Sequence, residues 1–351
     1  MAVELERGRL GRSCACSVEL AQSCFVTSDL PLLGFGLPVS GSWATPGTML
    51  RVARRAEELG YASLWSFQRV LYPAGALDPA DDAAHPSSRP VDDPSYRAVL
   101  DPVVALSYVA GHTDRIGLGT ATVCAPFTPP ALLAKAMTSL DVLSGGRLTI
   151  GLGIGWMRQE YAAAGVPFER RGARMEEYLR CLQALWTQDP VEFDGEFYAV
   201  PRSHVGPPPV QRPHPPVLLG GTAEPALRRA GRLAQGWISS SRQDLTRIGT
   251  SVETVRAGAR EAGRDPEAVR ILVRGLVDLV DTDAGRDRRP LHGTRAQVLD
   301  DLAALGGQGV TEVFFDLNFS PQVGSPDVDA DEAIAYAVHV LEALAPVHWP
   351  G

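Results

Sequence analysis

The pattern of apolar and polar positions is clearest in segment 115–161. Residues 116–122 are apolar, small or threonine at every position, which predicts a strand buried on both faces. Prolines then introduce a helix over about 130–143, whose apolar side chains recur at helical spacing. Gly145 and Gly146 end this helix, and residues 148–152 form a second buried strand. A strand, helix and strand of this length predict a right-handed parallel crossover.

The same alternation runs through the rest of the chain from residue 33. The predicted strands are 33–39, 62–66, 116–122, 148–152, 217–221, 236–241, 269–280 and 310–318. The predicted helices are 45–59, 100–111, 130–143, 157–187 with a break near 165–167, 223–234, 244–262, 293–306 and 330–345. A two-residue hairpin turn is expected at Asp194-Gly195, and 70–97 is a long irregular insert. Eight strands, each followed by a helix, predict an α/β (β/α)8 TIM barrel with insertions; a doubly wound sheet is the alternative.

The first 30 residues differ from the barrel pattern. They mix charged and small residues and lack the apolar core of a signal peptide. We expect residues 1–30 to be a disordered leader, with an ordered helix over 14–26 as the alternative, and residues 31–351 to form a single barrel domain.

Composition narrows the classes of partner. A net charge of −8 argues against nucleic acid or an anionic membrane surface as the main partner. The chain has no run of about 18 apolar residues, so no membrane span is predicted. The five cysteines and seven histidines show neither disulfide nor metal-ligand spacing. We therefore expect a cytoplasmic protein without a metal site that acts on a small molecule, and a homodimer.

In a barrel the functional site lies at the carboxyl ends of the strands. These ends carry small, polar or aromatic residues with few carboxylates and no catalytic triad, which favours a large bound cofactor over hydrolysis. The positions selected are Gln68, Arg69, Ala121, Thr122, Gly153 to Gln159, Gly220 to Thr222, Trp237 to Ser241 and Asp316 to Asn318.

Individual residues at these ends allow two interpretations each. The glycines Gly151, Gly153 and Gly155 indicate close approach of a flat or large group, or only tight packing. Gly220-Gly221-Thr222 either holds a phosphate at a helix start or supplies a plain cap through Thr222. Trp156 either stacks on a flat ring or packs beneath a helix. Arg69 either holds an anion or pairs with the acidic insert.

Longer motifs carry a family resemblance. The run RIGLGTATV, the block from SGGR to ERRGAR, and PVQRPHPPVLLGG with GRLAQGW resemble the luciferase-like monooxygenase superfamily over about 33–346. Within it, the chain is most similar to oxidoreductases that depend on the deazaflavin coenzyme F420. The resemblance implies a barrel that uses F420 or FMN to move a hydride or to activate oxygen.

The resemblance also implies roles for particular residues. Ala121-Thr122 matches a bulge whose non-proline cis peptide supports the back of the ring, and Gln159 matches a residue at the ring's pyrimidine edge. The segments around the ribityl chain and phosphate match Gly220, Gly221, Thr222, Trp237 and Ile238. Gln68-Arg69 and Trp156 stand where other members carry proton-transfer groups, so no catalytic acid or base is carried over. We take Arg69, Gln68 and Trp156 as the catalytic candidates.

These observations leave three hypotheses of function. The first is an F420-dependent oxidoreductase that transfers a hydride to or from a small organic substrate, with Arg158, Arg228 and Arg229 holding the acidic tail of F420. The second is an FMN-dependent monooxygenase. The third, of another class, is a carrier or binding protein that keeps the cofactor pocket without turnover.

Overall fold

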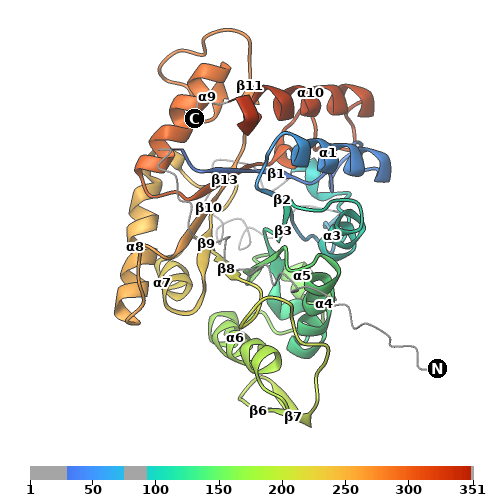
Figure 1. Cartoon of the computed structure of the whole chain (residues 1–351), viewed down its shortest axis with the longest axis vertical. Helices are drawn as coiled ribbons and strands as arrows, with labels where there is room; N and C mark the ends of the chain where they lie inside the picture. Colours follow the sequence, from blue (N-terminus) through green and yellow to red (C-terminus); the bar gives the residue numbers. More distant parts are fainter. Residues whose placement is uncertain (1–29, 75–92, 349–351) are drawn as a thin grey trace, which may run out of the picture.

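A closed barrel of parallel strands forms the centre of the molecule (Figure 1). The computed structural model describes residues 30–74 and 93–348. The barrel strands are β1 (Leu32–Gly36), β2 (Ser63–Ser66), β3 (Gly117–Thr120), β5 (Leu148–Gly153), β8 (Val217–Gly220), β9 (Gly236–Ile238), β10 (Arg270–Gly275) and β13 (Glu312–Phe315). Neighbouring strands pair in this order, and β13 pairs with β1 to close the ring. The predicted TIM barrel is confirmed.

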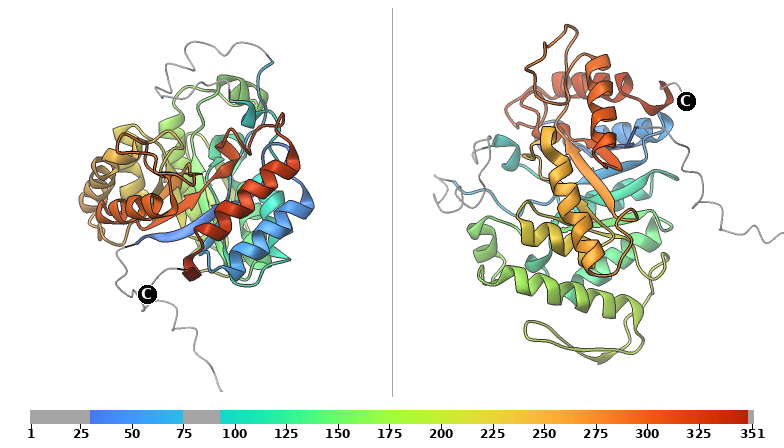
Figure 2. Two further views of the ribbon diagram at one scale, coloured as in Figure 1. Left: turned by 90° about the horizontal axis from the view of Figure 1, so that it is seen from above. Right: turned by 90° about the vertical axis from the view of Figure 1, so that its left-hand side faces the viewer.

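Helices cover the outside of the barrel (Figure 2). They are α1 (Pro46–Glu58), α3 (Pro102–Ala110), α4 (Pro130–Leu143), α5 (Arg158–Ala163), α6 (Arg171–Thr187), α7 (Glu224–Leu233), α8 (Ile248–Glu261), α9 (Arg295–Gly307) and α10 (Ala330–Ala343). Short 3-10 turns are η2 (Pro94–Tyr96), η3 (Ala125–Phe127), η4 (Leu245–Arg247), η5 (Leu317–Phe319) and η6 (Pro346–His348). None of the helices in the described ranges is long and apolar enough to cross a membrane.

The first and last helices lie side by side, which joins the two ends of the barrel domain (Figures 1 and 2). Arg55 of α1 forms a 2.9 Å salt bridge with Glu342 of α10. The hydroxyl of Tyr61, in the loop after α1, donates a 2.9 Å hydrogen bond to the carbonyl oxygen of Leu341. Helix α1 begins as its sequence predicts, because the side chain of Thr45 accepts from the backbone N–H of Thr48 and Pro46 occupies the first turn.

Large and small side chains on neighbouring strands are matched inside the barrel. The rings of Trp65 and Phe314 are buried there, with centroids 5.6 Å apart. A β-carbon on Gly119 would lie 2.3 Å from the ring of Trp65, and one on Gly34 would lie 3.0 Å from both Trp65 and Phe314. The interior is therefore a packed core, as in other barrels of this class.

Several predicted strands extend too far, among them 116–122 and 310–318, which are observed as Gly117–Thr120 and Glu312–Phe315. Strand 269–280 ends at Gly275, whose partner Phe315 is the last residue of β13; the chain then leaves the barrel, and β11 (Asp278–Leu279) pairs with β12 (His292–Gly293). Strand 236–241 ends at Ile238, opposite the end of β8, and strand 33–39 ends at Gly36. Single hydrogen bonds continue past two of these ends, from the N–H of Leu37 to the carbonyl oxygen of Trp65 and from the N–H of Ser239 to that of Leu272. The regular pairing stops there, and local sequence does not record where it stops.

The predicted hairpin is present, but its two-residue turn is wrong. Strands β6 (Val191–Asp194) and β7 (Ala199–Ser203) are joined by the four residues 195–198. The carboxylate of Glu177, on α6, accepts hydrogen bonds of 2.7 to 2.9 Å from the backbone N–H groups of Glu196, Phe197 and Tyr198. A side chain distant in sequence therefore fixes the longer turn.

Further predictions concern the break near 165–167, the leader and the acidic insert. The break near 165–167 is confirmed, because α5 ends before it and α6 begins after it. The predicted leader, apart from Leu30, and most of the acidic insert lie outside the described residues, so the leader and the domain boundary stay predictions.

Protein atoms occupy the space beside the three glycines of 151–155. A β-carbon on Gly151 would lie 1.9 Å from the carbonyl oxygen of Thr120, and one on Gly153 would lie 2.6 Å from the hydroxyl of Thr122. Gly155 has φ +69°, and its β-carbon would lie 2.6 Å from the sulfur of Cys124. These contacts favour tight packing between β5 and the segment after β3 as the reason for the glycines.

We predict that Gly151→Ala lowers the free energy of unfolding by about 1–3 kcal/mol, because the added methyl group overlaps backbone that cannot rotate away. Urea denaturation of the full chain measures the change. Gly307→Ala is the matched control, since nothing lies within 4 Å of its β-carbon and it lies at the end of a helix. Equal stability of the two variants would contradict this packing argument.

Candidate functional site

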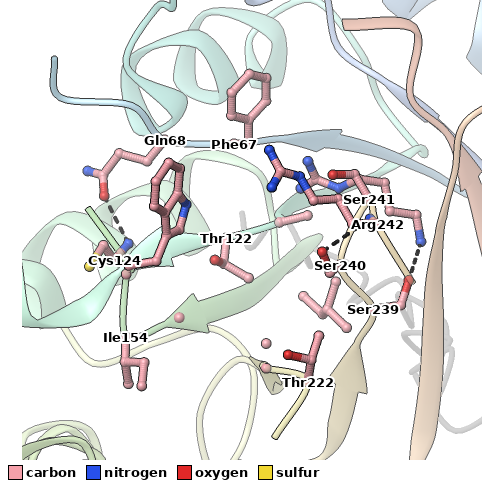
Figure 3. Close-up of a pocket in the computed structure, with 18 of the residues that line it drawn as sticks. Phe67, Gln68, Thr122, Cys124, Ile154, Thr222, Ser239, Ser240, Ser241 and Arg242 are labelled. Atoms are coloured by element: carbon pink, nitrogen blue, oxygen red, sulfur yellow. Dashed lines mark hydrogen bonds between the residues drawn. The ribbon is translucent and has the colours of Figure 1, made fainter. Parts of the chain in front are cut away.

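A cavity of about 310 Å³ opens at the carboxyl ends of the barrel strands (Figure 3). Most of the residues selected from the sequence meet in it. Those that line the cavity are Gln68, Arg69, Ala121, Thr122, Gly153 to Trp156, Gly220 to Thr222 and Ile238 to Ser241. The selected residues outside the lining are Met157, Arg158, Gln159, Trp237 and Asp316 to Asn318.

The segment after β3 forms one wall of the cavity. The peptide bond between Ala121 and Thr122 is cis, as the resemblance implies, and β4 (Val123–Cys124) follows it. Gln68 supports this wall, because its backbone N–H donates to the carbonyl oxygen of Thr122 at 3.3 Å. Its side-chain oxygen accepts from the backbone N–H of Cys124 at 2.9 Å (Figure 3). Gln68 thus has a structural role, which does not depend on any part in catalysis.

A helix start without a side-chain cap forms the opposite wall. Ala223 is the N-cap of α7, and no side chain in the described part of the chain caps this helix. The interpretation of Thr222 as a plain cap is therefore wrong. Gly221 has φ +147°, and its carbonyl oxygen accepts a 2.8 Å hydrogen bond from the indole N–H of Trp237. Trp237 therefore does not line the cavity but holds the backbone of Gly221 in place. An uncapped helix start of this kind favours an anionic group.

A hydroxyl-rich loop after β9 completes this side of the cavity (Figure 3). It comprises Ser239, Ser240, Ser241 and Arg242, all of which line the cavity. The hydroxyl of Ser239 accepts a 3.0 Å hydrogen bond from the backbone N–H of Arg274. The hydroxyl of Ser240 accepts a 3.2 Å hydrogen bond from the backbone N–H of Arg242. The loop exists because β9 ends at Ile238, three residues earlier than the sequence predicted.

Arg69 is held inside the cavity by an acid that sequence reasoning missed. Its Nη1 lies 2.9 Å from Oε2 of Glu160, and the two side chains are only 9% and 5% exposed. The other carboxylate oxygen of Glu160 accepts a 2.7 Å hydrogen bond from the backbone N–H of Val70. The interpretation of Arg69 as a surface residue is therefore wrong. Glu160 follows directly on the selected Gln159, but nothing in the local pattern distinguishes it from an exposed helix residue.

Aromatic rings surround the Arg69 guanidinium. Its central carbon lies 4.4 Å from the ring centroid of Tyr96 and 5.2 Å from that of Trp156. Trp156 lines the cavity and lies within 6.5 Å of Tyr96, centroid to centroid. The indole is thus placed to contact a bound molecule while also packing against its neighbours.

Arg274, on β10, is a second buried arginine of the cavity that sequence reasoning missed. Its side chain is 9% exposed, and its Nη1 lies 3.4 Å from Oδ2 of Asp316. Burial lowers the pKa of Arg274 from its ordinary value, and the nearby carboxylate of Asp316 opposes that shift. The available signal was a single arginine within the apolar run ILVRGLV.

The arginines expected to hold the tail of F420 have other partners. Arg158 pairs with Glu169 and lies over the ring of Phe168. Arg228 pairs with Glu224 and Glu261, and Arg229 pairs with Glu176. None of the three lines the cavity, and their contact with a cofactor tail stays a prediction. The described arginines that do line it, besides Arg69 and Arg274, are Arg171 and Arg242.

Two other polar groups lie in or near the cavity wall. Cys124 lines it, and burial raises the pKa of this thiol well above its ordinary value, with the negative charge of Glu160 as a further cause. Among the described residues, the side-chain oxygen of Gln159 is buried without a hydrogen-bond partner. The contact of Gln159 with a pyrimidine edge stays a prediction.

Comparison with known proteins identifies the family and agrees with the fold. The family model described as luciferase-like monooxygenase matches residues 32–299. An uncharacterized protein of Mycobacterium tuberculosis is 35% identical over 301 residues, which cover 85% of this chain and 94% of that protein. The FMNH2-dependent dimethylsulfone monooxygenase of Pseudomonas putida is 33% identical over 174 residues, which cover 49% of this chain and 47% of that enzyme.

A solved structure shows the same fold at lower identity. The coenzyme F420-dependent tetrahydromethanopterin reductase of Methanopyrus kandleri superposes with a TM-score of 0.66 at 18% identity, covering 91% of this chain and 98% of that one. The closed barrel, its site at the strand ends and the match of the family model over residues 32–299 lead to one conclusion. The chain belongs to the luciferase-like monooxygenase family.

Proposed function

We propose that this protein is an F420-dependent oxidoreductase that transfers a hydride to or from a small organic molecule. The observation that carries the proposal is the uncapped start of α7 beside Gly220, Gly221 and Thr222, facing the same cavity as the Ala121–Thr122 wall. A phosphate-bearing ring cofactor fits this arrangement, because the helix start favours the phosphate and the glycines permit its approach. Membership of a family of flavin- and deazaflavin-dependent enzymes also supports a phosphate-bearing ring cofactor.

One set of cavity residues binds the cofactor, and another set excludes water from it. Ala121 and Thr122 support the ring from one side, and Gly221, Thr222 and the start of α7 hold the phosphate. Bound F420 supplies a hydride donor or acceptor, which the protein itself lacks. Phe67, Tyr96, Trp156 and Phe319 line the remaining wall, where their rings exclude water and position the substrate. The homodimer and the cytoplasmic location also stay predictions.

We expect the apoprotein to bind F420 more tightly than FMN. Both cofactors share a tricyclic ring, a ribityl chain and a phosphate, but the tail of F420 adds carboxylates. Arg242 and Arg171 line the cavity and supply positive charge for them. Fluorescence titration at two ionic strengths measures this, and F420 affinity should fall as salt rises. Tighter binding of FMN would favour the FMN-dependent monooxygenase instead.

The phosphate position can be tested at Thr222, because Gly221 tolerates no side chain at φ +147°. We predict that Thr222→Asp weakens binding of F420 or FMN by tenfold or more, since like charges repel across a low-dielectric site. Thr222→Asn has nearly the same shape without the charge and should stay within about threefold of the wild type. Equal affinities of the two variants would place the phosphate elsewhere.

Cys124 reports on occupancy of the ring position. Its raised pKa keeps the thiol protonated at pH 8, so we predict slow alkylation by iodoacetamide in the apoprotein. Saturating F420 should slow it further, because Cys124 lines the cavity. Peptide-level mass spectrometry follows Cys124 separately, with the buried Cys181, which lies outside the cavity, as the control. Unchanged alkylation of Cys124 with bound cofactor would contradict the proposed ring position.

Oxidation of the cofactor by a substrate distinguishes an enzyme from a carrier protein that only binds the cofactor. The replacement of the family's usual proton-transfer groups by Gln68, Arg69 and Trp156 is the feature that favours a carrier. Oxidation of reduced F420 with a panel of ketones and enones distinguishes the two. A protein that binds F420 but oxidises it no faster than free cofactor with every acceptor is a carrier.

A further inference from the structure

We propose that the substrate of this site is a small organic anion, such as a carboxylate or sulfonate, bound between Arg69 and Arg274. This inference rests on the proposed function, because it assigns to the substrate the part of the cavity that the cofactor leaves. Arg69 follows β2 and Arg274 lies on β10, far away in sequence, and both line the cavity.

Each guanidinium has one donor atom that the described residues do not use. Both side chains are 9% exposed, and each pairs with its acid through Nη1, Arg69 with Glu160 and Arg274 with Asp316. Among the residues described here, the buried Nε atoms of Arg69 and Arg274 have no hydrogen-bond partner. The buried Nε atoms of Arg171, Arg232 and Arg256 also lack a partner among these residues, and the last two of these arginines do not line the cavity, so such atoms alone do not indicate a ligand. What distinguishes Arg69 and Arg274 is that both are buried cations in the cavity wall, where a planar guanidinium group matches a carboxylate or sulfonate in geometry.

The charges around the cavity also favour an anion. Within residues 30–74 and 93–348, four arginines line it, namely Arg69, Arg171, Arg242 and Arg274, against the carboxylate of Glu160. Arg171 and Arg242 are assigned above to the tail of the cofactor, which leaves Arg69 and Arg274 for the substrate. The carboxylate of Asp316 does not line the cavity, but it pairs with Arg274 and compensates the positive charge of that arginine. The lowered pKa of Arg274 has the positive charge of Arg69 as a lesser cause, which places the two cations within electrostatic reach of each other. An anion between them relieves this repulsion.

The surrounding side chains indicate the rest of the substrate. The ring of Tyr96 lies 4.4 Å below the Arg69 guanidinium and contacts Phe319 edge-on at 5.6 Å. The Arg274 guanidinium lies 5.0 Å from the centroid of Phe319, which also packs on Phe67. Aromatic surface thus connects the two cations. A substrate with an anionic end and an apolar, preferably flat, body fits it.

Barrel topology separates this anion position from the phosphate position of the cofactor. Arg69 follows β2 and Arg274 lies on β10, and these strands are separated only by β1 and β13. The uncapped helix start follows β8, on the other side of β9. The two anion positions therefore belong to different sectors of the strand ends, so one cofactor phosphate does not account for both.

Binding of a matched pair of probes tests the proposal. Phenylacetate and phenylacetamide have nearly the same shape and differ in charge. Isothermal titration of the full chain, with and without saturating F420, gives the two Kd values. We expect phenylacetate to bind at least about tenfold more tightly, because hydrogen bonds to charged groups contribute strongly when buried. Equal Kd values for the two probes would overturn the proposal.

A charge-balanced double variant identifies the cation. Arg274→Gln alone leaves the buried carboxylate of Asp316 unpaired and risks unfolding, so it is combined with Asp316→Asn. We expect the double variant to lose the preference for phenylacetate, to within about threefold, while binding F420 as the wild type does. Arg228→Gln, an exposed arginine outside the cavity, is the control and should keep the preference. Thermal melting shows that each variant is folded, and Arg69→Lys provides a second test that keeps the charge on Glu160 paired.

The outcomes distinguish this inference from the proposed function. Loss of F420 affinity in the double variant, with the probe preference intact, would assign Arg274 to the cofactor and overturn the inference. Failure of the wild type to bind F420 or FMN, with a phenylacetate preference that depends on Arg274, would refute the proposed cofactor and leave the anion site standing. A preference retained in both the double variant and Arg69→Lys would refute the site itself.

Discussion

The fixed volume inside the closed barrel constrains the rest of this structure. Parallel strands that close on themselves enclose a space that side chains must fill completely. Trp65 and Phe314 fill it only because glycines on neighbouring strands, such as Gly119 and Gly34, leave room for their rings. This matching fixes the register of the strands, and the register decides which residues reach the carboxyl ends together.

Two buried ion pairs determine where charge lies at the carboxyl ends of the strands. Arg69 and Arg274 are removed from water, and each is stabilised by one acid, Glu160 or Asp316. Removing two charges from water costs free energy that their mutual attraction does not reliably repay. Such pairs are therefore weak evidence for a purely structural role. Their position in the cavity wall supports the proposed role in ligand binding.

The two walls of the cavity differ in the kind of group they suit. The wall from Gly220 to Arg242 offers a helix start, hydroxyls and an arginine, which suit phosphate. The wall from Phe67 to Trp156, with Phe319, offers aromatic surface and buried cations. Under the proposed function, this asymmetry would give a cofactor and a substrate separate places in one cavity.

The sequence by itself determined the barrel, the order of its strands and helices, and the end of the barrel at which the site lies. Apolar periodicity is a local property, and parallel strands place all their carboxyl ends on one side, so these conclusions needed no tertiary contact. The motifs also located the cis peptide at Ala121–Thr122 and the glycines before α7. Only the tertiary structure decided the partner of Arg69, the place of Arg274 in the cavity, the four-residue turn held by Glu177 and the outward direction of Arg228. Each of these depends on a partner many residues away, and the strength of a charge or hydrogen bond is set by burial, which local sequence does not encode.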